Sequence, residues 1–74
     1  MKEKIIEVLG EFNEDIVDNL EQDLLASEIL DSFEIVKLVV ELEDAFDIEI
    51  AVEDVTAVNF RDAESIIKLI ESYL

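Results

Sequence analysis

A serine with two acidic neighbours stands at the clearest helix start in this chain. Asp31 precedes Ser32, and Glu34 stands three positions after Asp31. This spacing lets the aspartate cap the helix while the glutamate reaches back to the backbone N–H of the cap. Ser32 then takes the first helical position, where its hydroxyl points outward near the positive end of the helix dipole. A serine in this position could carry a covalently attached group, although a core helix with a capped start has the same pattern.

Other chemistry is poorly supported by the residue types present. The 74 residues include no histidine and no cysteine, which removes the commonest general base, thiolate nucleophiles and the usual zinc ligands. Paired carboxylates of the glycosidase kind need an enclosing pocket, for which the chain is too short. The acids Asp44, Asp47 and Glu49 lack the ligand spacing and central glycine of an EF-hand loop. We therefore expect neither an enzyme nor a metal site.

The charge of the chain points to protein partners. Twenty-one acidic residues against five basic ones give a net charge of −16, which repels nucleic acid and anionic membrane surfaces and favours a partner with a basic surface. About half of the residues are apolar (51%) and recur with helical period, so the chain should fold rather than stay disordered. The first residues lack the apolar core of a signal peptide, and no apolar run is long enough to span a membrane. We expect a cytoplasmic monomer.

Helical periodicity predicts a single small domain over residues 1–74 with four helices. The expected helices are residues 2–12, 32–46, 52–58 and 63–74. Residues 13–30 hold too many apolar side chains to be solvated, so we expect an ordered loop that crosses the bundle, with a short helical turn near residues 15–20. Asp62 is the expected N-cap of the last helix. The predicted fold class is all-α: a small four-helix bundle with a long loop between helices one and two and a short third helix.

The helix that starts at Ser32 has a broad apolar face made of two adjoining rows. One row is Phe33, Val36 and Val40, and the other is Ile35, Val39, Leu42 and Phe46. We expect Phe33 to anchor the first turn to the core, so that Ser32 cannot swing inward. The opposite face is acidic and predicts a docking surface for a basic partner. The expected docking residues are Glu34, Glu41, Glu43 and Asp44, with Val40 and Ile50 as apolar contacts at the edge.

The segment Leu30-Asp31-Ser32-Phe33 resembles the Asp-Ser-Leu or Asp-Ser-Phe signature of acyl carrier proteins. The similarity continues through Glu34, Val36, Leu38, Leu42, Glu43 and Phe46, and length, acidity and helix order extend it over essentially the whole chain. The resemblance implies a four-helix carrier in which a separate phosphopantetheinyl transferase attaches 4'-phosphopantetheine from coenzyme A to Ser32. Asp31 and Phe33 would support the site, and the thiol of the arm would hold the acyl group. Such a carrier is not itself an enzyme.

The cargo and pathway stay open. A glycine that often precedes the Asp-Ser pair is replaced in the stretch from Ala26 to Leu30, and Lys37 stands where many carriers have an acid. Phe33 and the Asn59-Phe60 pair look more like D-alanyl and peptidyl carriers than like the typical fatty-acid carrier. The resemblance thus implies acyl or aminoacyl cargo, from fatty acid, polyketide or nonribosomal synthesis, and loading and transfer enzymes with basic surfaces. The alternative is an acidic protein-binding module that docks by its charge alone and has no prosthetic group.

Overall fold

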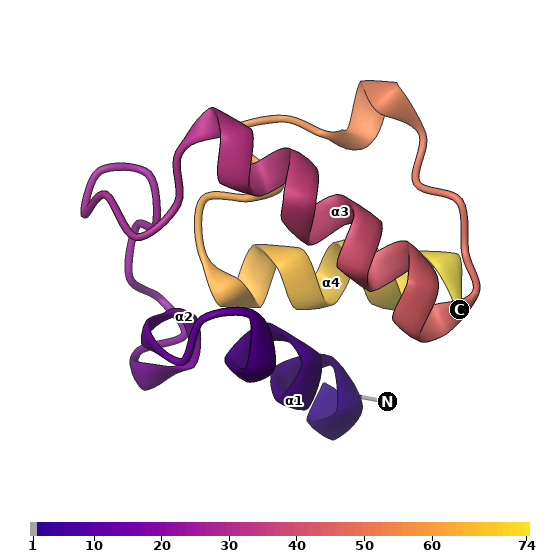
Figure 1. Ribbon diagram of the computed structural model, residues 1–74, viewed down its shortest axis with the longest axis horizontal. Coiled ribbons are helices and arrows are strands. Elements are labelled where there is room, and N and C mark those ends of the chain that lie inside the picture. Colours follow the sequence, from indigo (N-terminus) through magenta and orange to yellow (C-terminus); the bar gives the residue numbers. More distant parts are fainter. Residues whose placement is uncertain (1) are drawn as a thin grey trace.

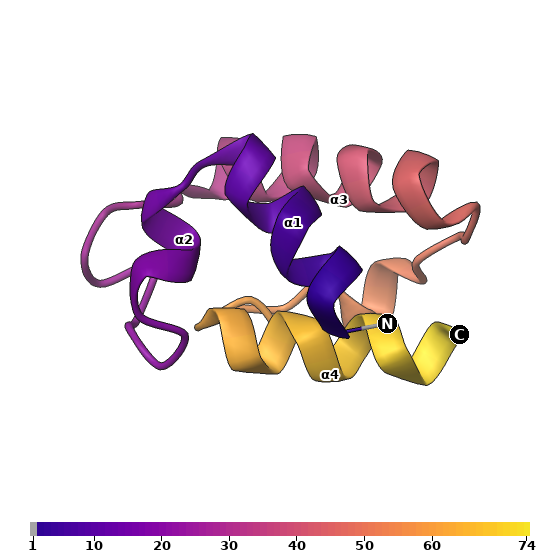
Figure 2. The same cartoon turned by 90° about the horizontal axis from the view of Figure 1, so that it is seen from below.

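The protein is all helical in the structure, a computed structural model that describes residues 2–74. Its elements in chain order are α1 (Lys2–Phe12), α2 (Asp15–Asp18), α3 (Ser32–Phe46), the 3-10 turn η1 (Val52–Asp54) and α4 (Ala63–Tyr73). Helix α1 lies across both α3 and α4, as the two views of Figures 1 and 2 show. None of the helices between residues 2 and 74 has the length and apolar character needed to cross a membrane. The predicted all-α bundle with a long loop before α3 is confirmed.

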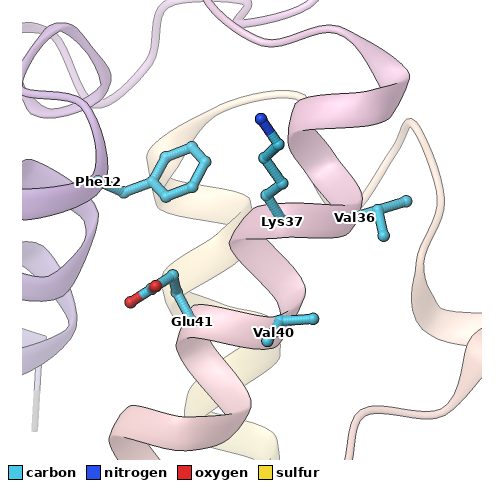
Figure 3. Close-up of a pocket in the computed structure, with 5 residues that line it drawn as sticks. All are labelled: Phe12, Val36, Lys37, Val40 and Glu41. Atoms are coloured by element: carbon cyan, nitrogen blue, oxygen red, sulfur yellow. The ribbon is translucent and has the colours of Figure 1, made fainter.

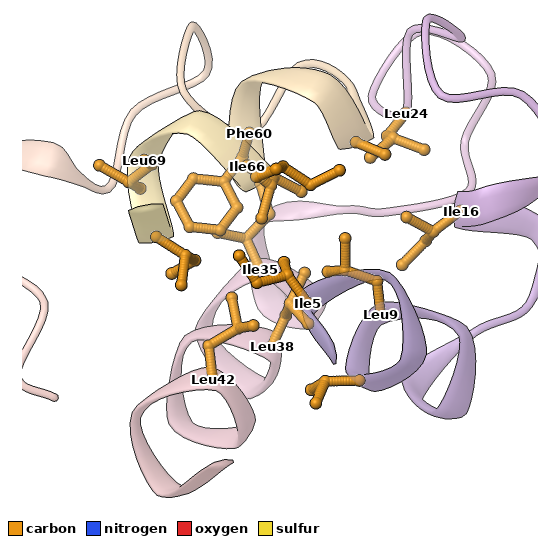
Figure 4. Close-up of a cluster of buried hydrophobic side chains, with 14 of the residues drawn as sticks. Ile5, Leu9, Ile16, Leu24, Ile35, Leu38, Leu42, Phe60, Ile66 and Leu69 are labelled. Atoms are coloured by element: carbon orange, nitrogen blue, oxygen red, sulfur yellow. The ribbon is translucent and has the colours of Figure 1, made fainter. Parts of the chain in front are cut away.

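The core forms where one stripe from each long helix meets the others (Figure 4). Its members recur every three or four residues along each helix, which places them on one face. The completely buried side chains of the three long helices are Ile5 and Leu9 in α1, Leu38 and Leu42 in α3, and Ala63, Ile66 and Ile70 in α4. Phe60 precedes α4 and is also completely buried. Because α1 touches both other long helices, it fixes their relative positions.

The segment before α3 is an ordered loop, as predicted, and the expected helical turn is present as α2. Its backbone is fastened to the start of α4: the Leu24 N–H donates to the Arg61 carbonyl at 2.6 Å, and the Glu64 N–H donates to the Leu20 carbonyl at 3.1 Å. Leu24 is completely buried. Satisfying these polar groups inside the molecule keeps a loop of this length in one conformation.

The predicted third helix over residues 52–58 is wrong in extent, because only the 3-10 turn η1 forms there. Val52 and Val58 are 86% and 77% exposed, so burial does not offset the poor helix propensity of this β-branched segment. Side chains replace the helical bonds instead. The Asn59 amide donates to the Asp54 carbonyl at 2.8 Å, and the Asn59 N–H donates to Thr56 Oγ1 at 3.1 Å.

Helix α4 begins at the predicted N-cap, Asp62. Its Oδ1 accepts a hydrogen bond from the Ser65 N–H at 2.8 Å, and Arg61 lies 3.4 Å from its Oδ2. Burial raises the pKa of this carboxyl, which is only 5% exposed, but the hydrogen bonds from Ser65 and Arg61 outweigh burial and bring the pKa below its ordinary value of 3.8. The cap is therefore ionised at neutral pH and holds both the helix start and the loop beside it.

Candidate functional site

Ser32 is the first residue of α3, and it is exposed. The residues that flank it in the fold are buried: Leu30 is 1% exposed and Ile35 is 8% exposed. The Leu30 N–H also donates to the Leu24 carbonyl at 3.0 Å. The chain thus enters the helix from a fixed point, so the serine hydroxyl is held at the surface.

Asp31 caps the helix as the sequence predicted. Its backbone is extended, and its Oδ1 accepts the Glu34 N–H at 2.8 Å. Its carbonyl accepts the Ile35 N–H at 3.0 Å. The predicted reciprocal bond, from the Asp31 N–H to the Glu34 carboxylate, is not among the hydrogen bonds of residues 2–74, so only half of the expected arrangement forms. Because Asp31 does the capping, the Ser32 hydroxyl is not needed for it.

Two grooves lie along α3, and Ser32 lines one of them. The first, with a volume of about 270 Å³, lies beside the serine. Its lining residues are Leu25, Ser32, Ile35, Val36, Val55, Thr56 and Ala57. The second, of about 240 Å³, is lined only by valines: Val36, Val39, Val40, Val52 and Val55. Val36 and Val55 line both grooves, so the two grooves are neighbours between α3 and the segment around η1; together we call them the apolar channel, and Ser32 lines the first of them.

The prediction that Phe33 anchors the first turn to the core is wrong. Phe33 is 66% exposed, and the Lys37 ammonium lies 4.5 Å from the centre of its ring. The buried stripe of α3 runs instead through Ile35, Leu38 and Leu42. Only one of the two apolar rows is buried, and the row that contains Phe33, Val36 and Val40 is exposed. Leu30 and Ile35, rather than Phe33, hold the serine turn against the core.

The predicted docking residues divide into exposed and structural groups. Val40 is 52% exposed, and Glu41 and Asp44 are exposed, whereas Glu34 is half-buried. Ile50 is only 6% exposed, so its predicted role as a surface contact is wrong. Glu43 is half-buried, and its Oε2 accepts the Ile50 N–H at 2.9 Å. This carboxylate therefore holds the connector after α3 in place, which the sequence-based assignment to the docking surface did not foresee.

The far wall of the apolar channel is fastened by Tyr73. Its hydroxyl donates to Asp54 Oδ2 and accepts the Ala51 N–H at 2.9 Å, so it joins α4 to both sides of Val52. The hydrogen bond to Asp54 raises the pKa of Tyr73 above its ordinary value of 10.0.

Sequence reasoning missed the groove residues that come from outside α3. Leu25, Val55, Thr56 and Ala57 reach the serine from two loops. No periodicity marks Leu25, Thr56 or Ala57, because a groove wall built from irregular backbone leaves no repeating signal. Val52 and Val55 line the second groove opposite Val36, Val39 and Val40 of α3, a pairing that depends on the fold.

Comparison with known proteins agrees with this geometry. The family model described as "Phosphopantetheine attachment site" matches residues 1–70. The chain is 36% identical over 69 residues to the D-alanyl carrier protein of Streptococcus gordonii, a match that covers 92% of this chain and 87% of the relative. The D-alanyl carrier proteins of Streptococcus sanguinis and Streptococcus thermophilus match with the same identity and the same coverage.

An exposed helix-start serine in an all-α bundle, with a matching family model over most of the chain, defines a phosphopantetheine-bearing carrier domain. The chain belongs to the acyl carrier protein family. Its cofactor is 4'-phosphopantetheine, covalently bound. The structure fits this group, because the serine hydroxyl is exposed, does not cap its own helix and opens onto a groove of about 270 Å³. Carrier proteins of this family are generally non-catalytic and interact with transferases and biosynthetic enzymes.

Proposed function

We propose that Ser32 is the attachment residue and that the chain carries an acyl or aminoacyl group as a thioester on the arm. One observation carries this proposal: Ser32 is exposed at a helix start that Asp31 caps. Leu30 and Ile35 anchor this turn in the core, and the serine lines an apolar groove. The N–H groups of the first helical turn favour the phosphate that would be attached there. Asp31 keeps these groups oriented by capping the turn.

Attachment would form a bond between Ser32 Oγ and the phosphorus of coenzyme A that bears the pantetheine. The leaving group is adenosine 3',5'-bisphosphate, and the hydroxyl proton passes to a base. This chain has no histidine to act as that base and no cysteine to act as the thiol. The transferase therefore supplies the base, and the arm supplies the thiol once attached. The chain itself contributes a positioned hydroxyl and a binding surface, not a catalytic group.

An aminoacyl cargo of the D-alanyl kind is the proposal that the relatives support best, since three carriers of that description share 36% identity with this chain. The Phe33 that follows the serine supports the same proposal. Loading then requires an enzyme that activates the carboxyl group of D-alanine and passes it to the arm thiol. A fatty acyl cargo would instead gain from burial in the valine-lined groove.

The partners proposed are a phosphopantetheinyl transferase and loading or transfer enzymes with basic surfaces. The net charge of −16 supports this choice, because it raises the encounter rate with positive surfaces. Glu34, Val40, Glu41 and Asp44 remain the proposed contacts on the carrier. A cytoplasmic location and a monomeric state also remain proposals.

Intact mass tests the attachment residue directly. The purified chain is incubated with coenzyme A, magnesium and a phosphopantetheinyl transferase, and it should gain the mass of one phosphopantetheine group. The variant Ser32→Ala should gain none. Ser27→Ala is the matched control, because Ser27 is also exposed and lies just before the site, and it should be modified like the wild type. An unmodified wild-type chain with several broadly acting transferases would instead favour an acidic binding module without a prosthetic group.

A further inference from the structure

A third groove lies between α3 and the end of α1, and it shares Val36 and Val40 with the valine-lined groove. Its volume is about 360 Å³, and it is lined by Phe12, Val36, Lys37, Val40 and Glu41. Figure 3 shows these side chains, with Phe12 approaching from α1 and the other four coming from α3. The residues from α3 follow Ser32 by four to nine positions, which corresponds to about 6–14 Å along the helix axis. A protein bound at the serine would therefore also reach this groove.

The groove is lined by one basic residue, the exposed Lys37, together with the acidic Glu41. Lys37 is the only lysine or arginine in α3, and its ammonium lies 4.5 Å from the centre of the Phe33 ring. Figure 3 shows its side chain running beside Phe12 toward the first turn of the helix. Contact with an aromatic face restrains the flexible side chain and partly shields the ammonium from water, both of which strengthen its attraction for a carboxylate.

Apolar surface lies beside this charge. Phe33, Val36 and Val40 are 66%, 58% and 52% exposed, and they form one row along α3. Single exposed apolar residues are ordinary, but a row of three that borders a groove indicates a binding surface. The chemistry that fits is an apolar side chain with a carboxylate next to it. A second copy of this chain is a poor occupant, because each copy has a net charge of −16 and the two repel.

We propose that this groove receives an apolar side chain and an adjacent carboxylate from the enzyme that modifies Ser32. The inference rests on the proposed function of Ser32. The basic surface of that enzyme meets the acidic carrier, while the carboxylate pairs with Lys37 and so fixes the register of docking. A surface that is basic throughout is repelled at Lys37, so the pair selects among basic partners. Phe12 makes α1 part of the docking surface, whereas the sequence had placed that surface on α3 and Ile50.

Steady-state kinetics of Ser32 modification tests the role of Lys37. Lys37→Met removes the charge and keeps the aliphatic stem, and it should raise the KM for the carrier about tenfold while kcat changes less than about twofold. Lys37→Arg keeps the charge and should restore a KM near that of the wild type. Lys68→Met is the matched control, because it changes the net charge equally from an exposed position on α4. Circular dichroism and thermal melts confirm that each variant is folded.

A second readout maps the contact itself. The carrier variant Ser32→Ala, which cannot be modified, is mixed with the transferase and treated with a carbodiimide that joins amines directly to carboxylates. Mass spectrometry should find a link from Lys37 to an aspartate or glutamate of the transferase, and this link should be lost in the double variant Ser32→Ala/Lys37→Arg.

The kinetic results separate this inference from the proposed function. A KM that is unchanged or lower in Lys37→Met would overturn the docking proposal, since a lower KM would mean that the enzyme repels this charge. In that case a wild-type chain that still gains mass at Ser32 leaves the carrier function intact. If the wild-type chain gains no mass, both the docking proposal and the carrier function are rejected.

Discussion

The Tyr73 hydroxyl donates a hydrogen bond to Asp54 Oδ2 while it accepts one from the Ala51 N–H. These two bonds hold η1 against α4. We predict that Tyr73→Phe, which keeps the ring and loses both bonds, speeds hydrogen exchange of the Ala51 amide and lowers the melting temperature. The Ile50 amide is an internal control, because its acceptor is Glu43 and its protection should change less. Equal exchange rates for Ala51 in the two proteins would contradict this assignment.

The same tyrosine should make stability fall at alkaline pH. Because the folded state raises the pKa of Tyr73 above 10.0, it binds the phenol proton more tightly than the unfolded state does. The resulting stabilisation is fully present below pH 10.0 and is lost as the pH rises through the raised pKa. Urea melts between pH 9 and pH 11 should therefore show a steeper loss for the wild type than for Tyr73→Phe. Parallel losses would show that the phenol does not contribute.

Asp62 should make stability fall at acid pH, whereas Tyr73 makes it fall at alkaline pH. Its pKa is lower in the folded state than the ordinary 3.8, so its stabilisation is present above that value and is lost as the pH falls through the folded pKa. Asp62→Asn keeps a capping oxygen but removes the titration. Its stability should vary less than that of the wild type as the pH falls below 5, measured by urea melts. The exposed Asp18→Asn changes the net charge equally and should follow the wild-type curve.

Loss of the Asp31 cap should weaken both the helix and the site. Asp31→Ala removes the acceptor of the Glu34 N–H and should destabilise the fold by about 1 kcal/mol, which is about 4–8 °C in melting temperature for a domain of this size. It should also slow modification of Ser32, because the first turn frays. Asp31→Asn retains an acceptor and should behave nearly as the wild type. If Asp31→Ala is as stable as the wild type and is modified at the same rate, the cap supports neither the helix nor the site.

Glu28 offers a stabilising change close to the site. Its φ of 63° lies in the left-handed region, which costs side-chain-bearing residues free energy that glycine does not lose. Glu28→Gly should therefore stabilise the fold by about 1 kcal/mol, seen in urea melts. Ala26→Gly is the control in the same loop, because Ala26 is exposed and has no positive φ. It should be neutral or destabilising, and the same gain in both variants would point to a general effect of loop glycines.

The helix starts could be predicted from the sequence because caps are local. Asp31 and Asp62 each bond to a backbone N–H three residues ahead, so neither prediction depended on the rest of the fold. The exposed position of Ser32 at the helix start followed from the Asp31 cap. The buried pairs Ile5 and Leu9 in α1, and Ile66 and Ile70 in α4, could be predicted in the same way, since each of these two helices has one clear apolar stripe.

The rest of the site could not be predicted from the sequence, because it depends on which helices and loops cover which face of α3. Helix α3 has two apolar rows, and nothing local decides that Ile35 is buried while Phe33 is exposed. Glu43 looked like a solvent residue because its bond to the Ile50 N–H closes only when the connector folds back. The grooves beside Ser32 likewise join residues that are far apart in sequence, such as Leu25 and Thr56. Tertiary contacts, rather than propensity, settled these points.

The backbone bonds between residues 20–24 and residues 61–64 bear on the timing of protein synthesis. The loop that leads into α3 is fastened by residues that the ribosome adds some thirty positions after Ser32. Until Arg61 and Glu64 have been made, Leu20 and Leu24 lack their backbone partners, and the turn that presents the serine has no fixed support. A transferase that recognises the folded turn should therefore act only after Arg61 and Glu64 have been made.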